Sequence, residues 1–413
     1  MPYDPRLDYA TVPTVAAADF INIEKGVENA GNSEAGGVWL DDPQFNVSGT
    51  ATDDQKLTAA MDYAKGETYP PAILLSNRSH TFNTARVPGA SSGNLYTGFR
   101  LIGPNRGITN AELDPENGAC KVNLTTNGAW LSITGGVDVW NNVIAGITFL
   151  GTSNTTFIGG DSSTVWHGCQ LRDLGFKSFR TVLGTQAQKL LMTTCLINGY
   201  FQVQGVYNGA IHIGGSDNRL FMDGALVDAS QAYATAGGVA GQFFFWFDGF
   251  DNSCVGPLYI TCTGVWGGVK VTGVQYNATP TTNFGMTTFL GGLIMEGHNA
   301  TDPCFGAVMR IEGGLVKIRD CYIGRAMSDP TAMTHSPTDA GVIHQTGGYV
   351  LLDGPTYGRA TSVAETVPMF YQAGGTARIR NASVATHGGT WSGLPRVQSV
   401  GGTMSVDDTV TAL

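Results

Sequence analysis

Residues 241–253, GQFFFWFDGFDNS, combine aromatic rings with two carboxylates, and this combination suits carbohydrate chemistry. Alternate side chains of a β-strand point to opposite faces. Two sets therefore separate: Phe243, Phe245 and Phe247 on one face, and Phe244, Trp246 and Asp248 on the other. We expect the first set to fill a core and the second to lie outside, where sugar C–H groups stack on rings and hydroxyls bond to acids. The alternative is that all these rings pack in a core or in a subunit interface.

The candidate catalytic residues are carboxylates in and near this segment. They are Asp223, Asp248 and Asp251, and the candidate substrate-binding rings are Phe244, Trp246 and Trp266. Glycoside hydrolysis needs two carboxyl groups about 5 Å apart for retention of configuration, or roughly 6.5–9.5 Å apart for inversion. Strands stacked at about 4.8 Å can provide either separation. We predict that Asp223, one coil before Asp248, raises the pKa of one acid so that it stays protonated.

Other catalytic chemistries find less support in the sequence. A polysaccharide lyase needs a base and a cation near a uronate; Lys270, Arg310 and Arg325 are available, but no spacing distinguishes them, so hydrolysis is favoured. Three isolated histidines show no metal-ligand spacing and are expected to be structural: His212, His298 and His344. No metalloprotease or nucleotide-binding motif occurs in a suitable context, so neither a metal nor another cofactor is predicted.

A polar residue recurs every 25 residues in the middle of the chain. The segments QLRDLGF, CLINGYF, LFMDGAL and FWFDGFD place it at Asp173, Asn198, Asp223 and Asp248. This period matches one coil of a three-sided β-helix, whose coils bury apolar side chains only by stacking. Acids at such corners are expected first as turn formers, as for Asp173, Asp320 and Asp353. The predicted fold is all-β, a parallel β-helix beginning near residue 70; a β-sandwich or propeller is the alternative.

Before the repeats, residues 51–66, ATDDQKLTAAMDYAKG, predict an amphipathic helix. Thr52 and Gln55 have the capping-box spacing, and the two acids between them suit the positive end of a helix. An apolar stripe follows at Leu57, Ala60, Met61 and Ala64. A stack of strands has an open apolar end with unpaired edges, and we expect this helix to cover it.

The order of this helix, AILLSNRSHTFN and FRLIGPNRG resembles the N-terminal entry of right-handed parallel β-helices of the pectate-lyase-like superfamily. In that family a TDD helix caps the end and is followed by a strand of the form LPAGTY and a strand ending in GxG. This chain departs from the pattern at residues 76–80, where SNRSH replaces the PAGTY element. Together with a non-repeating front of about 50 residues, these features resemble bacteriophage tailspike proteins.

The resemblance implies an organisation and a set of partners. Residues 1–50 would dock to the virion, residues 51–110 would hold the capping helix and first strands, and residues 111–413 would form the parallel β-helix. The family implies a homotrimer that contacts other virion tail proteins and binds host surface polysaccharide, which many members cleave.

Composition limits the remaining possibilities. Lys and Arg number 23 against 33 Asp and Glu, a formal charge of −10, which disfavours nucleic acid as a partner. We predict neither a signal peptide nor a membrane span, because no basic start precedes an apolar stretch and no apolar run reaches about 18 residues. The expected location is the virion tail, after synthesis in the host cytoplasm. Three functions stay open: a glycan-binding attachment protein, an active depolymerase, and a purely structural virion component.

Overall fold

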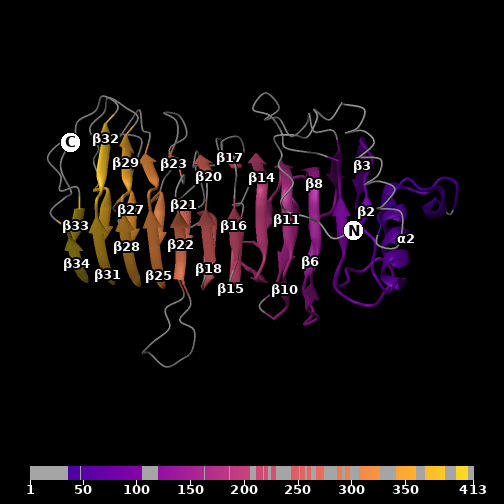
Figure 1. Ribbon diagram of the computed structural model, residues 1–413, viewed down its shortest axis with the longest axis horizontal. Helices are drawn as coiled ribbons and strands as arrows, with labels where there is room; N and C mark the ends of the chain where they lie inside the picture. Colours follow the sequence, from indigo (N-terminus) through magenta and orange to yellow (C-terminus); the bar gives the residue numbers. More distant parts are fainter. Residues whose placement is uncertain are drawn as a thin grey trace, which may run out of the picture.

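The computed structural model describes two parallel β-sheets and one α-helix. The described residues are 36–46, 48–104, 120–161, 163–185, 187–204, 211–216, 218–221, 225–228, 243–250, 252–255, 258–261, 267–273, 286–290, 294–297, 307–325, 341–359, 368–386 and 397–407. Within them, neighbouring strands pair in parallel throughout both sheets. The chain advances along the long axis, so strands from successive parts of the sequence stack side by side (Figure 1).

Sheet A contains 21 of the described strands. They are β1 (Val38–Trp39), β2 (Ile73–Leu74), β3 (Ser79–Phe82), β4 (Arg100–Ile102), β5 (Lys121–Leu124), β8 (Val143–Leu150), β11 (Gln170–Lys177), β14 (Leu196–Gln204), β16 (Arg219–Phe221), β17 (Ala225–Asp228), β19 (Asn252–Val255), β20 (Leu258–Thr261), β22 (Met286–Leu290), β23 (Ile294–Gly297), β25 (Leu315–Arg319), β26 (Tyr322–Arg325), β28 (Tyr349–Asp353), β29 (Thr356–Arg359), β31 (Thr376–Arg380), β32 (Ser383–Thr386) and β34 (Thr403–Val406).

Sheet B contains 13 of the described strands. They are β6 (Gly128–Ile133), β7 (Val139–Trp140), β9 (Thr155–Gly160), β10 (Val165–His167), β12 (Thr181–Leu183), β13 (Leu190–Thr193), β15 (Ile211–Ser216), β18 (Phe243–Phe250), β21 (Gly267–Val271), β24 (Met309–Ile311), β27 (Ile343–Gln345), β30 (Phe370–Gln372) and β33 (Val397–Ser399). A short 3-10 helix, η2 (Pro43–Phe45), precedes α2 (Asp53–Gly66). The architecture is therefore all-β and parallel β-helix-like, as predicted.

The spacing between stacked strands is irregular. Ile197 pairs with Leu220, 23 positions later, whereas Leu101 pairs with Ile144, 43 positions later. The 25-residue period therefore holds only locally, because the connections between strands differ in length. We predicted that the β-helix begins near residue 70, but strand pairing begins earlier. Strand β1 pairs with β2 through Val38 and Ile73.

The core between the sheets is filled by apolar side chains from alternate strand positions. Aromatic rings pack along it: Phe149 stacks on Phe176 of the next paired strand with centroids 5.7 Å apart, and Phe157 contacts Phe176 edge-on at 4.8 Å. Such ring contacts tie one coil to the next, which a coil needs because it cannot bury these groups alone.

Corner residues in the left-handed region confirm part of the turn prediction. Asp173 and Asp320 have φ angles of 54° and 51°, a conformation that Asn, Asp and Gly tolerate best. Asp353 instead ends strand β28, and its carboxylate accepts a hydrogen bond from Asn381 Nδ2 at 3.0 Å. These acids serve the corners of the fold.

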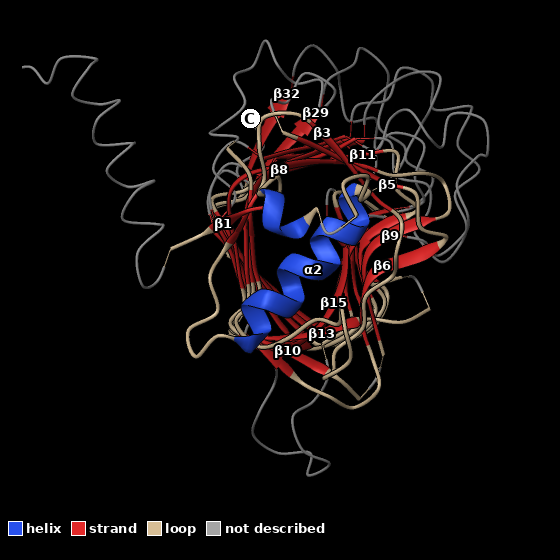
Figure 2. Ribbon diagram, turned by 90° about the vertical axis from the view of Figure 1, so that its right-hand side faces the viewer, coloured by secondary structure: helices blue, strands red, loops and turns tan. Residues whose placement is uncertain are grey.

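Helix α2 lies across the end of the stacked strands, as predicted (Figure 2). Its capping box is complete: the Gln55 backbone N–H donates to Thr52 Oγ1, and the Thr52 N–H donates to Gln55 Oε1. The predicted apolar stripe is buried, at Leu57, Ala60, Met61 and Ala64. The helix thereby closes the apolar core at this end.

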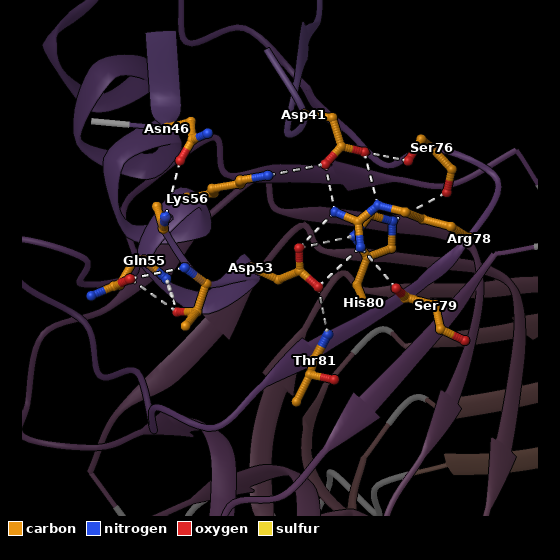
Figure 3. A network of polar contacts seen from close by, with 12 residues as sticks. Asp41, Asn46, Asp53, Gln55, Lys56, Ser76, Arg78, Ser79, His80 and Thr81 are labelled. Atoms are coloured by element: carbon orange, nitrogen blue, oxygen red, sulfur yellow. Dashed lines mark hydrogen bonds and ion pairs between the residues drawn. The ribbon is translucent and has the colours of Figure 1, made fainter. Parts of the chain in front are cut away.

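Residues 76–80, SNRSH, bind the start of α2 to the first strands (Figure 3). Arg78 Nη2 donates to Asp41 Oδ1 at 2.5 Å and to Asp53 Oδ1 at 2.6 Å, and Ser76 Oγ donates to Asp41 Oδ2. The hydrogen bonds from Arg78 hold the pKa of Asp41 well below its usual range. Through Arg78, this segment forms ion pairs with Asp53 at the start of α2 and with Asp41 after β1.

Candidate functional site

Strand β18 alternates as the sequence predicted. Phe243, Phe245 and Phe247 are buried in the core, whereas Trp246 and Asp248 are half-buried on the opposite face. We call that side the outer face of sheet B. The Phe244 side chain lies outside the described part of the structure, as do Asp223, Asp251 and Trp266.

The strand register aligns Trp246 with aromatic and basic residues of neighbouring strands. The row, which we call the aromatic–basic row, runs through His212, Trp246, Lys270, Arg310, His344 and Tyr371. Its members come from six strands whose sequence separations are unequal. The row follows the long axis of the molecule, because the strands stack along it (Figure 1).

Trp246 is enclosed by its neighbours in this row. The His212 ring stacks on it with centroids 4.0 Å apart and planes inclined by 7°, and Lys270 Nζ lies 4.1 Å from its ring centroid. These two residues come from the strands on either side of β18, so they cover opposite faces of the indole. The Trp246 Nε1–H donates to Thr272 Oγ1 at 2.9 Å. His212 and Lys270 therefore cover the faces of this ring, and Lys270 is held there by its ion pair with Glu312.

Asp248 faces a lysine. Lys189 Nζ lies 3.0 Å from Asp248 Oδ2. Asp248 lies inside β18 and pairs with Gly214 of β15, so its predicted place in a column of turn acids is wrong. A Cβ added to Gly214 would lie 2.6 Å from the Lys189 side chain, so glycine at this position makes room for the ion pair.

His212 holds an acceptor atom without a partner. Its Nδ1–H donates to the Thr185 carbonyl oxygen at 2.6 Å, which leaves Nε2 as the unprotonated nitrogen of a neutral ring. Nε2 is buried, makes no hydrogen bond, and lies 4.0 Å from Asp248 Oδ2. Burial lowers the pKa of His212, and the nearby lysines add to this effect. Because a buried acceptor without a partner is costly, this atom marks a place for a donor group.

A second carboxylate on this face was not predicted. Glu312 bridges two cations, with Lys270 Nζ at 3.2 Å and Arg310 Nε at 2.7 Å. The Thr272 N–H donates to the Phe247 carbonyl oxygen, and the Glu312 N–H donates to the Val271 carbonyl oxygen. These bonds align Asp248 with Thr272, and Thr272 with Glu312, on successive strands. Two strand spacings separate them, about 10 Å along the axis. The sequence signal was hidden because Glu312 follows Asp248 by 64 positions, which is not a multiple of the 25-residue period.

The other candidate residues are dispersed. His344 is buried in the aromatic–basic row and its ring contacts Tyr371 edge-on at 5.2 Å. Arg325 ends β26 in sheet A, without a described side chain, and His298 lies outside the described residues. Across the described ranges, no group of three or more His, Cys, Asp or Glu residues is placed to hold a metal ion. In the same ranges, no helix combines the length and apolar character needed to cross a membrane.

Comparisons with known proteins give structural likeness alone. No protein-family model and no curated protein sequence matches the chain. Among solved structures, the tailspike protein of the Acinetobacter phage vB_ApiP_P1 aligns with a TM-score of 0.33 and 11% identity, over 89% of this chain and 62% of that one. The chain thus spans less than two thirds of that structure. Two substituted forms of the catalytic domain of a GH87 α-1,3-glucanase in complex with nigerose align with TM-scores of 0.30 and 13% identity; they cover 85% and 87% of this chain and 68% and 69% of theirs. At these values the likeness assigns no function.

Proposed function

We propose that this protein is a bacteriophage tail protein that binds the surface polysaccharide of its host on the outer face of sheet B. The observation that carries the proposal is the buried His212 Nε2, an acceptor without a partner beside Asp248 and the edge of Trp246. A sugar hydroxyl is a neutral donor of the right kind, and it can donate to Nε2 while a neighbouring hydroxyl bonds to Asp248. The C–H groups of the same sugar would then contact the indole edge.

The wider assembly is part of this proposal. We take the stacked coils to close into a right-handed solenoid that trimerises, with residues 1–50 docking to other proteins of the virion tail. The sequence resemblance to tailspikes supports these features, and the glycan face would then point outward from the particle.

Binding is favoured over cleavage by the surroundings of the two acids. Inverting hydrolysis requires one carboxyl that donates a proton to the leaving oxygen and one that activates water. Asp248 and Glu312 are about as far apart as the upper end of the inverting range, which keeps hydrolysis as the second candidate function. Each of them, however, forms an ion pair with a cationic group: Asp248 with Lys189, and Glu312 with Lys270 and Arg310. Carboxylates held in this way are arranged to orient ligand hydroxyls.

The test is equilibrium binding of the purified protein to capsular polysaccharides and lipopolysaccharides from a panel of bacteria. We expect one member of the panel to bind, and we expect Asp248→Asn to weaken binding about tenfold, since hydrogen bonds to charged groups contribute roughly 1.5–3 kcal/mol. Asp407→Asn is the matched control, because Asp407 pairs with Arg380 at 3.4 Å on sheet A. Release of reducing ends by the parent, lost in Asp248→Asn, would establish hydrolysis instead. Equal affinity of both variants and the parent would contradict the proposed site.

A further inference from the structure

A second aromatic residue on the outer face of sheet B is far more open than Trp246. Trp140 ends strand β7, and 47% of its surface is exposed. Val139 beside it is buried, so the strand turns its indole away from the core. Tryptophan has a large apolar surface, and its exposure to water is unfavourable. A ligand that covers the exposed ring would remove this surface from water.

One face of the Trp140 ring is supported and the other is open. The His167 ring stacks on it with centroids 3.8 Å apart and planes inclined by 8°. In the described ranges, β10 is the strand that pairs with β7, and His167 is the ring that contacts Trp140. On the side of the preceding coil the contact is made by the backbone, where Gly98 donates its N–H to the Trp140 carbonyl oxygen at 2.7 Å, and 47% of the Trp140 surface stays exposed beside His167. A planar ligand surface can therefore approach the face turned away from His167.

A carboxylate lies beside this ring in a fixed position. Asp138 Oδ1 accepts from the Val165 N–H at 2.8 Å, and Asp138 Oδ2 accepts from His167 Nε2–H at 3.3 Å. The Asp138 side chain is 42% exposed, so lone pairs stay available to a ligand.

The loop that carries Asp138 is itself anchored. The Gly135 N–H donates to Asp161 Oδ2 at 2.9 Å, and the Gly136 N–H donates to Thr164 Oγ1 at 2.7 Å. An anchored loop lowers the entropy cost of ordering the site when a ligand binds.

We propose that Trp140 and Asp138 form a separate sugar-binding subsite that takes one pyranose ring of the polysaccharide, an inference that rests on the proposed function. The apolar C–H face of the pyranose stacks on the open indole face, and an equatorial hydroxyl donates to the Asp138 carboxylate. His167 acts as a positioning residue, since it supports the indole from behind and holds Asp138 through a hydrogen bond.

The subsite lies on the same face as the His212 site but at a distance along the axis. The register runs from Trp140 to His167, Thr193, Ser216 and then Phe250 of β18. Four strand steps of about 4.8 Å place β7 and β18 about 19 Å apart. A polysaccharide running along the molecule can therefore occupy both sites, whereas a disaccharide can occupy only one at a time. The inferred ligand is an extended chain of several sugars.

The experiment compares long and short ligands by isothermal titration calorimetry. The probes are the intact polysaccharide that binds the parent and a disaccharide fragment of it, and the proteins are the parent, Trp140→Ala, Trp140→Phe and Tyr69→Ala. We expect Trp140→Ala to weaken polysaccharide binding about tenfold, with Trp140→Phe between it and the parent, because the smaller ring retains part of the stacking surface. Tyr69 is 75% exposed, so Tyr69→Ala controls for loss of an exposed ring and should bind as the parent does.

Each outcome separates this inference from the proposed function. If Trp140→Ala binds polysaccharide as tightly as the parent while Asp248→Asn binds weakly, the subsite is refuted and the proposed function stands. If the parent binds no polysaccharide, the proposed function itself fails. If Trp140→Ala keeps full affinity but changes the mass in light scattering, the ring belongs to a contact between copies and the inference is overturned. Should Trp140→Ala fail to fold by thermal unfolding, Trp140→Phe and Asp138→Asn decide the matter by the same comparison.

Discussion

His212 is the residue on which the candidate site depends most. Its ring is only 5% exposed although it lies on the outer face, because Trp246 covers it and Thr185 binds its Nδ1–H. The neutral state follows from this environment: burial disfavours the charged ring and lowers its pKa, the hydrogen bond to Thr185 and the charge of Asp248 oppose this shift, and Lys189 and Lys270 add to it. A neutral imidazole leaves Nε2 free to accept a hydroxyl.

This neutral state predicts how stability depends on pH. Since the pKa of His212 is lowered by folding, the unfolded chain takes up a proton first as the pH falls below about 6.5. The free energy of unfolding therefore decreases as the pH falls from about 6.5 towards 5. It continues to decrease until the pH reaches the lower pKa of the folded ring. His80, whose pKa burial also lowers, contributes in the same sense.

Chemical denaturation at pH 7 and pH 5 measures the effect. We expect the drop in the free energy of unfolding to be smaller in His212→Gln and smaller again in the double variant with His80→Gln. A drop as large in the double variant as in the parent would show that neither histidine is held neutral.

At the scale of elements, a buried ion pair between Arg86 and Asp54 adds to the Arg78 contacts that hold the cap formed by α2. Arg86 is 1% exposed, and its Nη2 lies 3.2 Å from Asp54 Oδ1, while Thr84 Oγ1 also donates to that carboxylate. The pair joins the first turn of α2 to the chain after β3. Burial lowers the pKa of Arg86, so the guanidinium relies on Asp54 for its charge balance.

Asp54→Asn should therefore destabilise the protein strongly. Removal of one partner leaves a buried charge unpaired, which costs about 3–5 kcal/mol. Thr52→Ala removes only the capping box and should cost about 1 kcal/mol. Urea unfolding of both variants, with unchanged slopes, provides the comparison; equal effects of the two substitutions would show that the ion pair does not hold the cap.

Elements also show which features the sequence could predict. The helix at Asp53–Gly66 and the alternation of Phe245, Trp246 and Phe247 follow from local rules, and the structure has both. The pairing of strands could not be predicted, because the connections range from short corners to long excursions and register depends on all of them. No sequence pattern therefore indicated that Lys189 or Glu312 belongs to the site. Lys189 lies 59 positions before Asp248, and Glu312 lies after it.

At the scale of the whole molecule, the outer face of sheet B brings together basic and aromatic side chains from distant parts of the sequence. Lys189, Lys270 and Arg310 gather there, each paired with a carboxylate, and two tryptophans stand about 19 Å apart along the axis. The stacking of strands turns residues that are distant in the sequence into a continuous surface (Figure 1). Such a surface suits a polymer with a repeating unit better than a small ligand.

The most direct test of this account is a structure of the protein with an oligosaccharide of its host polysaccharide. We predict a sugar on the outer face of sheet B, with one hydroxyl within about 3 Å of His212 Nε2 and another within that distance of the Asp248 carboxylate. A sugar bound on sheet A, or bound with His212 Nε2 still unpartnered, would contradict it.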